Sequence, residues 1–222
     1  MIDNGDIPFV TKHFSFYDTL QQNEKTSFLK GIQRVSFLSG SVLTAGSQSC
    51  LGTILIERGS LQASILSAEG REITLFTLQD EEICTLSASC LFMPKNFNVH
   101  ITAQTDTSAF LLPLKVFSAL CDSNIYAENF SYKITVKRFA SVMEAIEPIL
   151  FDRVDTRIIR YLLSESKSRG DTLYTTQEQL AKNTGTAREV VSRILKKLQE
   201  QNIITQKRGA IHIINRDALA AL

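Results

Sequence analysis

The chain has 222 residues, a formal net charge of +1 at pH 7, and 44% hydrophobic residues with no Trp. This length suits one large domain or two modest domains. No apolar run approaches the ~18 residues of a membrane span, and the N-terminal segment MIDNGDIPFV lacks the basic-then-apolar pattern of a signal peptide. We therefore expect a cytoplasmic protein whose cysteines are free thiols, namely Cys50, Cys84, Cys90 and Cys121.

The two parts of the chain differ in charge. Residues 151–222 hold 13 Lys and Arg against 8 Asp and Glu, whereas residues 1–150 hold 11 against 15. The C-terminal part therefore carries a balance of +5 and the rest a balance of −4. A basic segment of this kind favours a polyanionic partner such as DNA.

The predicted secondary structure of the first 123 residues changes from helical to strand-rich and back to helical. Residues 1–13 are predicted to be irregular, and Phe14 to Gly31 helical, with Asn23 as an N-cap between two short helices. From Gln33 to Pro113, short β-branched segments alternate with Gly and acidic turns, which is typical of an antiparallel sandwich or barrel. Leu114 to Ser123 is predicted to be a short helix. The strand-like segments are VSFL, SVLTAG, GTILIERGSLQASILSAEGREITLFTL, NVHITAQT and SAFLLP.

A heptad pattern follows, in which the apolar positions advance alternately by four and three residues. This pattern predicts two helices wound around each other in a parallel dimer, with Asn129 as the polar core residue that fixes their register. The alternative is one amphipathic helix that packs only on its own sandwich, for which the period would be nearer 3.6 residues. The predicted dimer seam consists of Ile125, Asn129, Tyr132, Val136, Phe139, Met143, Ile146 and Leu150.

Pro148 weakens the end of this helix, so we place a hinge at about Leu150 to Asp155. A further helix is predicted from Asp155 to Ser164, and the polar segment SESKSRGDTLYT after it is predicted to be a loop.

The segment from Thr175 to Leu198 predicts two helices joined by a tight turn. Thr176 is a suitable N-cap, Gly185 can take the positive φ that ends the first helix, and Thr186 with Glu189 fits a capping box for the second. This arrangement is a helix-turn-helix, whose second helix enters the DNA major groove. The residues predicted to point inward between the two helices are Leu180, Ala181, Val191 and Ile194.

The outward face of the second helix carries the chemistry of base recognition. A guanidinium can donate two hydrogen bonds to guanine and a carboxylate can accept one from cytosine, so Arg193 and Glu189 are the expected base readers. After Gln201, the segment IITQKRGAIHII predicts a β-hairpin, the wing of a winged helix, with Arg208 and Gly209 at its tip. The alternative is a solvated helix face with i,i+4 ion pairs such as Glu189 to Arg193. The predicted base-reading residues are Arg188, Glu189, Ser192 and Arg193, and the predicted phosphate contacts are Thr176, Lys182, Thr186, Lys196, Lys197, Lys207 and Arg208.

The order of these parts resembles the bacterial transcription regulators typified by the cAMP receptor protein and the fumarate and nitrate reduction regulator. The resemblance covers essentially the whole chain, and its most specific stretches are TAREVVSRILKKLQEQNII, LGTILIERGSL with EGREITLFTL, and FDRVDTRIIRYLL. It implies an α+β fold in three parts. These are an effector-sensing antiparallel β-roll of the cyclic-nucleotide-binding jelly-roll kind over residues 1–123, a dimerisation helix over 124–151, and a winged helix-turn-helix over 152–222.

This resemblance implies a homodimeric, sequence-specific transcription regulator that binds double-stranded DNA. In the family, Arg-Glu-x-x-x-Arg at the start of the recognition helix reads a TGA-containing half-site, which matches Arg188, Glu189 and Arg193. Ser192 beside Arg193 is more similar to the oxygen-regulator branch. The operator should then be a palindrome related to TTGA or TGTGA, and the loop from Ser164 to Thr175 is expected to touch RNA polymerase.

The sensor departs from the branches of the family that bind cAMP. Those members hold the ribose and cyclic phosphate with a Gly-Glu-Leu segment and an Arg-Ser pair, where this chain has Thr85 and Phe97-Asn98. A buried phosphate needs a cationic or multi-donor partner, so we do not expect cAMP. The family's iron–sulfur ligands include closely spaced N-terminal Cys, and residues 1–49 contain none, so we do not expect a cluster either.

Other effectors remain open. Haem has a candidate ligand in His100, with Met93, Cys84 and Cys90 near it in sequence, although a lone His on an apolar strand is usually a core residue and both Cys are better interpreted as small buried hydrophobes. Ser87 and Ser89 could hold an anion, or could simply cap a short helix. The candidate effector pocket is Thr85, Leu86, Ser87, Ser89, Phe97, His100, Tyr132 and Phe139.

The rival class is a cupin-like, metal-dependent enzyme with a helical tail. Such an enzyme needs a His and Glu metal constellation in the roll, and residues 33–113 contain only His100. We therefore expect no catalytic residue, no metal site and no enzyme activity.

Overall fold

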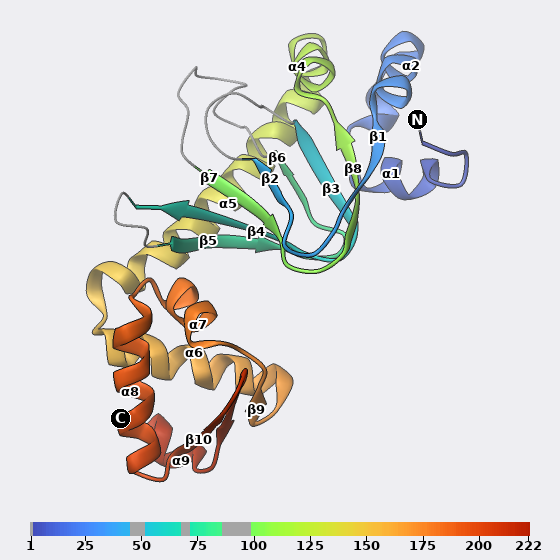
Figure 1. The fold of residues 1–222 in the computed structure, drawn as a ribbon. Coiled ribbons are helices and arrows are strands. Elements are labelled where there is room, and N and C mark those ends of the chain that lie inside the picture. The colour runs from blue at the N-terminus through green and yellow to red at the C-terminus, as the bar shows by residue number, and fades with distance from the viewer. Residues whose placement is uncertain (1, 45–51, 68–71, 86–98) are drawn as a thin grey trace. The chain divides into compact units, whose positions relative to one another are not determined.

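The computed structural model describes residues 2–44, 52–67, 72–85 and 99–222. The chain divides into two compact units: the first joins Met1–Ser64 with Leu75–Val142, and the second joins Ile65–Thr74 with Met143–Leu222. Figure 1 traces the elements of both units.

Helical turns precede the first strand of the first unit. They are α1 (Ile7–His13), a 3-10 turn (Tyr17–Thr19) and α2 (Gln22–Gly31). The prediction that residues 1–13 are irregular is wrong, because Pro8 lies at the start of α1, where its fixed φ favours a helix and its missing N–H costs nothing.

The predicted N-cap of the next helix is also wrong. Gln21, and not Asn23, occupies that position. The Gln21 N–H donates to Glu24 Oε2 at 2.8 Å, which satisfies a main-chain donor that the helix itself leaves unpaired.

Two four-stranded sheets form the roll, in the orders β1-β8-β3-β6 and β2-β7-β4-β5. The registered pairs of β1 with β8, β3 with β8, β3 with β6 and β2 with β7 are antiparallel, so the predicted antiparallel fold is confirmed. The strands are β1 (Gln33–Phe37), β2 (Val42–Thr44), β3 (Thr53–Arg58), β4 (Leu61–Leu66), β5 (Glu72–Leu78), β6 (Ile83–Thr85), β7 (Val99–Ala103) and β8 (Thr107–Leu112).

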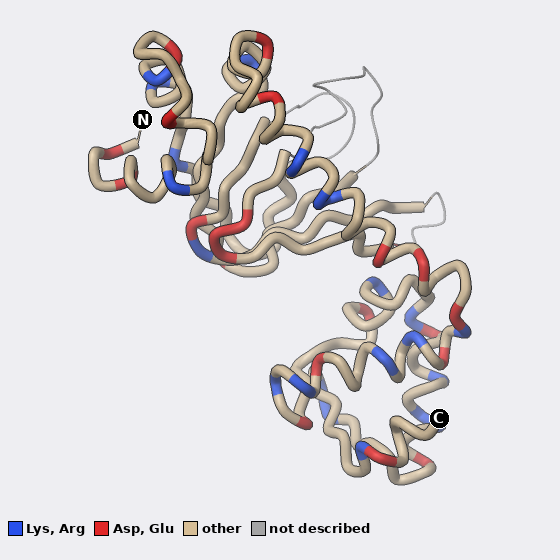
Figure 2. Tube along the Cα trace, turned by 180° about the vertical axis from the view of Figure 1, so that it is seen from behind, with Lys and Arg blue, Asp and Glu red and all other residues tan. Residues whose placement is uncertain are grey.

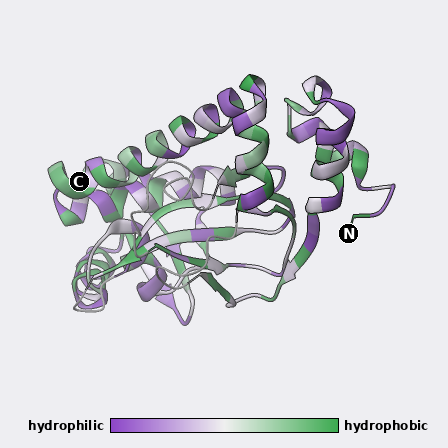
Figure 3. Ribbon diagram, turned by 90° about the horizontal axis from the view of Figure 1, so that it is seen from above, coloured by the Kyte–Doolittle hydropathy of each residue, from purple (hydrophilic) through white to green (hydrophobic). Residues whose placement is uncertain are grey.

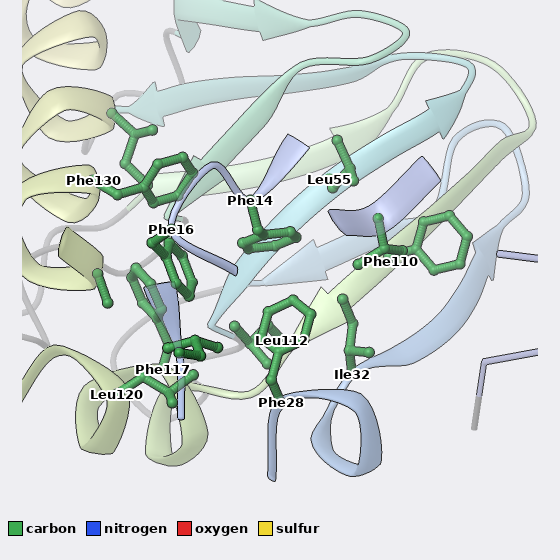
Figure 4. Close-up of a cluster of buried hydrophobic side chains, with 14 residues drawn as sticks. Phe14, Phe16, Phe28, Ile32, Leu55, Phe110, Leu112, Phe117, Leu120 and Phe130 are labelled. Carbon is green, nitrogen blue, oxygen red and sulfur yellow. The ribbon is translucent and has the colours of Figure 1, made fainter. Parts of the chain in front are cut away.

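Strand β3 is buried on both faces and separates two hydrophobic cores. Leu55 belongs to a cluster built mainly of Phe rings, whereas Ile54 and Ile56 belong to a second cluster inside the roll. Successive residues of a strand point to opposite faces, which explains this division. Figure 4 shows the first cluster, in which the Phe14 and Phe28 ring centroids lie 5.1 Å apart and those of Phe16 and Phe130 lie 5.2 Å apart.

Helix α4 (Leu114–Ser123) has the predicted bounds, and the long helix α5 (Ile125–Phe151) follows it. One face of α5 is buried in the first unit through Ala127, Phe130, Ser131 and Ile134. The helix continues past Pro148, and the chain turns at Asp152 and Arg153 before the next helix.

The second unit contains a three-stranded sheet in the order β10-β11-β9 and a hydrophobic core of its own. Its first helix runs from Val154 to Arg169, so the prediction that it ends at Ser164 is wrong. The i,i+4 ion pair between Glu165 and Arg169, 3.3 Å long, supports the extra turn, and Gly170 ends it. The elements are α6 (Val154–Arg169), β9 (Thr172–Leu173), α7 (Gln177–Thr184), α8 (Arg188–Glu200), β10 (Ile204–Lys207), β11 (Ala210–Ile213) and α9 (Arg216–Ala220).

Candidate nucleic-acid interface

Helix α7 begins and ends as its sequence predicts. The Thr176 side chain accepts a hydrogen bond from the Gln179 N–H at 3.1 Å, which makes it the N-cap. Gly185 has φ +62° and ends the helix in the left-handed conformation. The Thr186 N–H then donates to the Ala181 carbonyl at 3.0 Å, which closes the turn.

The cap of α8 differs from the prediction. Ala187 is its N-cap and makes no side-chain hydrogen bond, whereas Thr186 is buried in the turn. The Thr186 amide donates to the Ala181 carbonyl and is not available to Glu189, so the predicted capping box does not form. Thr186 stays a predicted phosphate contact, although little of it is exposed.

The two helices pack through the predicted inward residues. Leu180, Ala181 and Val191 are buried, and Ile194 packs against the same core. Because these positions fix how α8 is rotated about its axis, the opposite face of α8 points outward. The exposed residues of that face are Arg188, Glu189, Ser192, Arg193 and Lys196.

The two expected base readers on this exposed face, Glu189 and Arg193, are not engaged in ion pairs with described residues. Lys196 differs, because its Nζ lies 4.0 Å from Glu200 Oε1. A free guanidinium and a free carboxylate one helical turn apart can both reach base edges in a major groove.

Cations of neighbouring elements could hold the DNA backbone. Lys197 of α8 is exposed, and Lys207 and Arg208 are exposed at the tip of the β10–β11 hairpin, where Gly209 has φ +74°. Lys182 is instead engaged by a carboxylate, because its Nζ lies 2.8 Å from Glu72 Oε2. Figure 2 marks the basic and acidic residues along the trace of this unit.

A chain of side-chain amides joins the hairpin to both helices, and the sequence did not point to it. Gln177 Nε2 donates to Gln206 Oε1 at 3.0 Å, and Gln206 Nε2 donates to Gln199 Oε1 at 3.1 Å. These residues come from α7, β10 and α8, so the wing is fixed to both helices of the helix-turn-helix. Only the fold brings them together, since no spacing in the sequence links them.

The predicted dimer seam lies on a face of α5 that the single chain leaves open. Ile125, Val136 and Phe139 are 66%, 66% and 65% exposed, and Leu150 is 67% exposed. Asn129, Tyr132 and Met143 are exposed as well, and Ile146 is half-buried. These exposed hydrophobic residues give α5 a second apolar face besides the one buried in the first unit. Figure 3 colours the ribbon by hydropathy and shows hydrophobic and hydrophilic residues alternating along the helices.

The candidate effector pocket is only partly described. Leu86, Ser87, Ser89 and Phe97 lie outside the described residues. Thr85 is buried, with its hydroxyl 3.2 Å from that of Thr53. His100 is half-buried on β7, and Tyr132 and Phe139 are exposed on α5.

Cys84 is a small buried residue in the core of the roll, as predicted, and burial raises the pKa of its thiol to about 11. Cys90 and Cys50 lie outside the described residues. Within the described ranges, no three His, Cys, Asp or Glu side chains gather where they could hold a metal ion. Nor is any described helix both long and apolar enough to cross a bilayer.

Comparison with known proteins gives both sequence and structural matches. Residues 156–222 match the model of the Crp-like helix-turn-helix domain. A crystal structure of a candidate transcriptional regulator of the CRP/FNR family from Eubacterium rectale is 31% identical, with a TM-score of 0.86, covering 95% of this chain and 98% of that one. No curated protein matches in sequence.

More distant structures share the fold. The c-di-GMP-responsive global regulator CLP of Xanthomonas campestris is 20% identical, with a TM-score of 0.73 over 87% of this chain and 99% of that one. A CRP/FNR-family transcriptional regulator of Thermus thermophilus is also 20% identical, with a TM-score of 0.64, covering 85% of this chain and 97% of that one. The likeness therefore spans the roll, the long helix and the winged helix.

Proposed function

The chain belongs to the CRP/FNR family of transcriptional regulators, and on this premise we propose that it binds a palindromic operator as a homodimer under the control of an effector other than cAMP. The residues that read bases are Arg188, Glu189, Ser192 and Arg193. The phosphate contacts are Thr176, Lys182, Thr186, Lys196, Lys197, Lys207 and Arg208.

One observation carries this proposal: the polar face of α8 is exposed while its apolar face is fixed against α7. Arg193 is suited to donate two hydrogen bonds to a guanine, and Glu189 to accept one from a cytosine. The exposed cations at the hairpin tip supply contacts to phosphate, which position the protein without reading sequence.

The exposed seam of α5 supports a second copy as the partner. A coiled coil would bury Val136, Phe139 and Leu150, which the single chain leaves in water. Two-fold symmetry would then place two recognition helices roughly 34 Å apart, one turn of DNA, and would explain a palindromic site.

The effector acts in the roll and is a small molecule, a gas or a redox signal. Thr85 and Phe97-Asn98 replace the residues with which cAMP-binding relatives hold the nucleotide, which supports a different ligand. An absorbance spectrum of anaerobically purified protein tests the classes: a Soret band would assign haem, charge-transfer bands an iron–sulfur cluster, and a colourless protein another small molecule.

Base reading is tested on an operator selected from randomised duplex DNA with the wild-type protein. Glu189→Ala and Arg193→Ala should each weaken binding by about 1–3 kcal/mol and relax the preference at one base position. Lys196→Ala is the matched control, because losing a phosphate contact should weaken binding to all sequences alike and lower the salt slope by about 1. If both base-reading variants keep the wild-type sequence preference, the assignment is wrong.

A further inference from the structure

Arg157 is a buried cation that the base-reading model does not use. It lies in the first turn of α6 and is 9% exposed. A cation near the N-terminus of its own helix faces the positive end of the helix dipole, and its removal from water is unfavourable. Its position therefore requires strong compensating contacts.

Those contacts are main-chain carbonyl oxygens of two other helix ends. Arg157 Nε donates to the Thr184 carbonyl at 2.8 Å and Nη2 to the Gly185 carbonyl at 3.4 Å. Nη1 donates to the Asp152 carbonyl at 2.9 Å and to the Ile149 carbonyl at 3.4 Å. One guanidinium thus joins the C-terminal end of α5 to the turn that leads into α8.

The chemistry of these two ends explains why arginine fits here. The last carbonyls of a helix have no partner within it, and the dipole makes that end negative. A planar guanidinium offers donors in a fixed fork and can serve two such ends at once. A lysine ammonium is a compact point charge and cannot hold both sets of carbonyls in one geometry.

A packing contact joins the same two segments independently. A Cβ built on Gly185 would lie 2.6 Å from Ile149 Cδ1, so the Ile149 side chain is packed directly against the turn. The end of α5 is therefore held to the turn by hydrogen bonds and by an apolar contact. The start of α8 is therefore held to the last turn of α5 by contacts that lie within the second unit.

We propose that Arg157 is a positioning residue for operator recognition, which sets the half-site spacing that the dimer accepts without touching DNA. This inference rests on the proposed function. Because α5 carries the dimer seam and α8 reads bases, the angle between them determines how far apart two half-sites must be. Loosening the joint should broaden the accepted spacing and leave reading within each half-site unchanged.

The test compares spacing preference with base preference in the full-length dimer. Binding is measured to the selected operator, to operators with one base pair inserted or deleted at the dyad, and to operators with one mutated half-site base. A one-pair change moves the half-sites by about 3.4 Å and rotates them by about 35°, so the wild type should lose about tenfold or more in affinity. Arg157→Lys should lose about threefold or less on the same change, with an unaltered penalty for the mutated base.

Arg160→Lys is the matched control. It makes the same substitution one turn further along α6, at a residue that pairs with the Asp152 side chain and is exposed, and it should keep the wild-type spacing preference. Simple destabilisation would lower binding to all operators by one factor. A wild-type spacing penalty in Arg157→Lys, or an equal loss of spacing and base preference, would overturn the proposal.

Ile149→Ala keeps the test decisive if Arg157→Lys does not fold. It loosens the same joint without uncovering a buried charge, and it should lower the spacing penalty about twofold to threefold. An unchanged penalty in this variant would also contradict the proposal. Failure of the proposed function looks different, because the wild-type protein would then select no palindrome from random DNA.

Discussion

Gly185 meets two constraints, and each excludes a side chain. Its φ of +62° lies where a residue with a Cβ pays about 1–2 kcal/mol. The added Cβ would also come within 2.6 Å of Ile149 Cδ1, and overpacking of this kind costs about 1–3 kcal/mol. We predict that Gly185→Ala lowers the free energy of unfolding by about 2–5 kcal/mol in urea titrations.

Gly209→Ala separates the two causes. Gly209 has φ +74°, but a Cβ there would meet nothing within 4 Å, so only the backbone cost of about 1 kcal/mol is expected. Adding Ile149→Ala to Gly185→Ala should recover part of the loss, since the clashing atoms are then gone. Equal losses in the two glycine variants would show that Ile149 moves aside freely.

Cys84 offers a residue-scale test of the roll's core. Cys84 is 1% exposed, and burial raises the pKa of its thiol to about 11. At pH 8 such a thiol is about 0.1% thiolate, against about a quarter for a free cysteine, and the thiolate is the reactive form. We predict that iodoacetamide labels Cys84 at least about 100-fold more slowly in the native protein than in urea, as followed by peptide mass mapping. Similar rates in both states would contradict the buried position.

At the scale of elements, local chemistry predicted the helix-turn-helix well and its second cap badly. The Thr176 cap and the Gly185 stop depend on neighbouring residues only, so the sequence identifies them. Thr186 has the side chain of an N-cap, but Ala187 occupies that position, and the Thr186 amide that a capping box would offer to Glu189 donates to the Ala181 carbonyl instead. The competing hydrogen bond is not visible in a residue pattern.

Polar composition also misled at the end of α6. The segment SESKSR has the composition of a loop, but it contains neither Gly nor Pro, and its helical spacing brings Glu165 and Arg169 together. The first residue that breaks the helix is Gly170, with φ +80°. Strand β6 was missed for a different reason, because Ile83–Thr85 is too short to show a period.

The Thr176 cap gives a prediction at this scale. Its hydroxyl oxygen accepts from the Gln179 N–H at 3.1 Å, and losing a Thr cap typically costs about 1 kcal/mol. We predict that Thr176→Ala lowers the unfolding free energy by about that amount. Thr175→Ala is the neighbouring control and should change it by less than about 0.5 kcal/mol, since Thr175 caps no helix. Equal effects of the two substitutions would assign the loss to another cause.

At the scale of the whole molecule, the sequence predicted the order of the domains but not the side-chain contacts that join their elements. Strand segments, a heptad seam and a basic helix pair each have a local pattern, and together they indicated the family. Arg157 has no such pattern, because its partners are carbonyls whose positions exist only after α5, α6 and α7 have packed. The same holds for the amide chain from Gln177 to Gln199.

The heptad seam makes the strongest demand on the whole molecule, since it leaves large apolar side chains in water unless a second chain covers them. Phe139 is 65% exposed on the seam, and Tyr126 is 61% exposed on the same helix but off the seam. A buried carboxylate without a partner costs several kcal/mol, whereas an exposed one costs little. We predict that Phe139→Glu shifts the protein from dimer to monomer in sedimentation equilibrium at micromolar concentration, while Tyr126→Glu stays dimeric.

The Phe139→Glu monomer should also lose its preference for a palindrome over a single half-site, because only a dimer can hold both half-sites at once. A dimer that tolerates Phe139→Glu would mean that the chains associate through another surface.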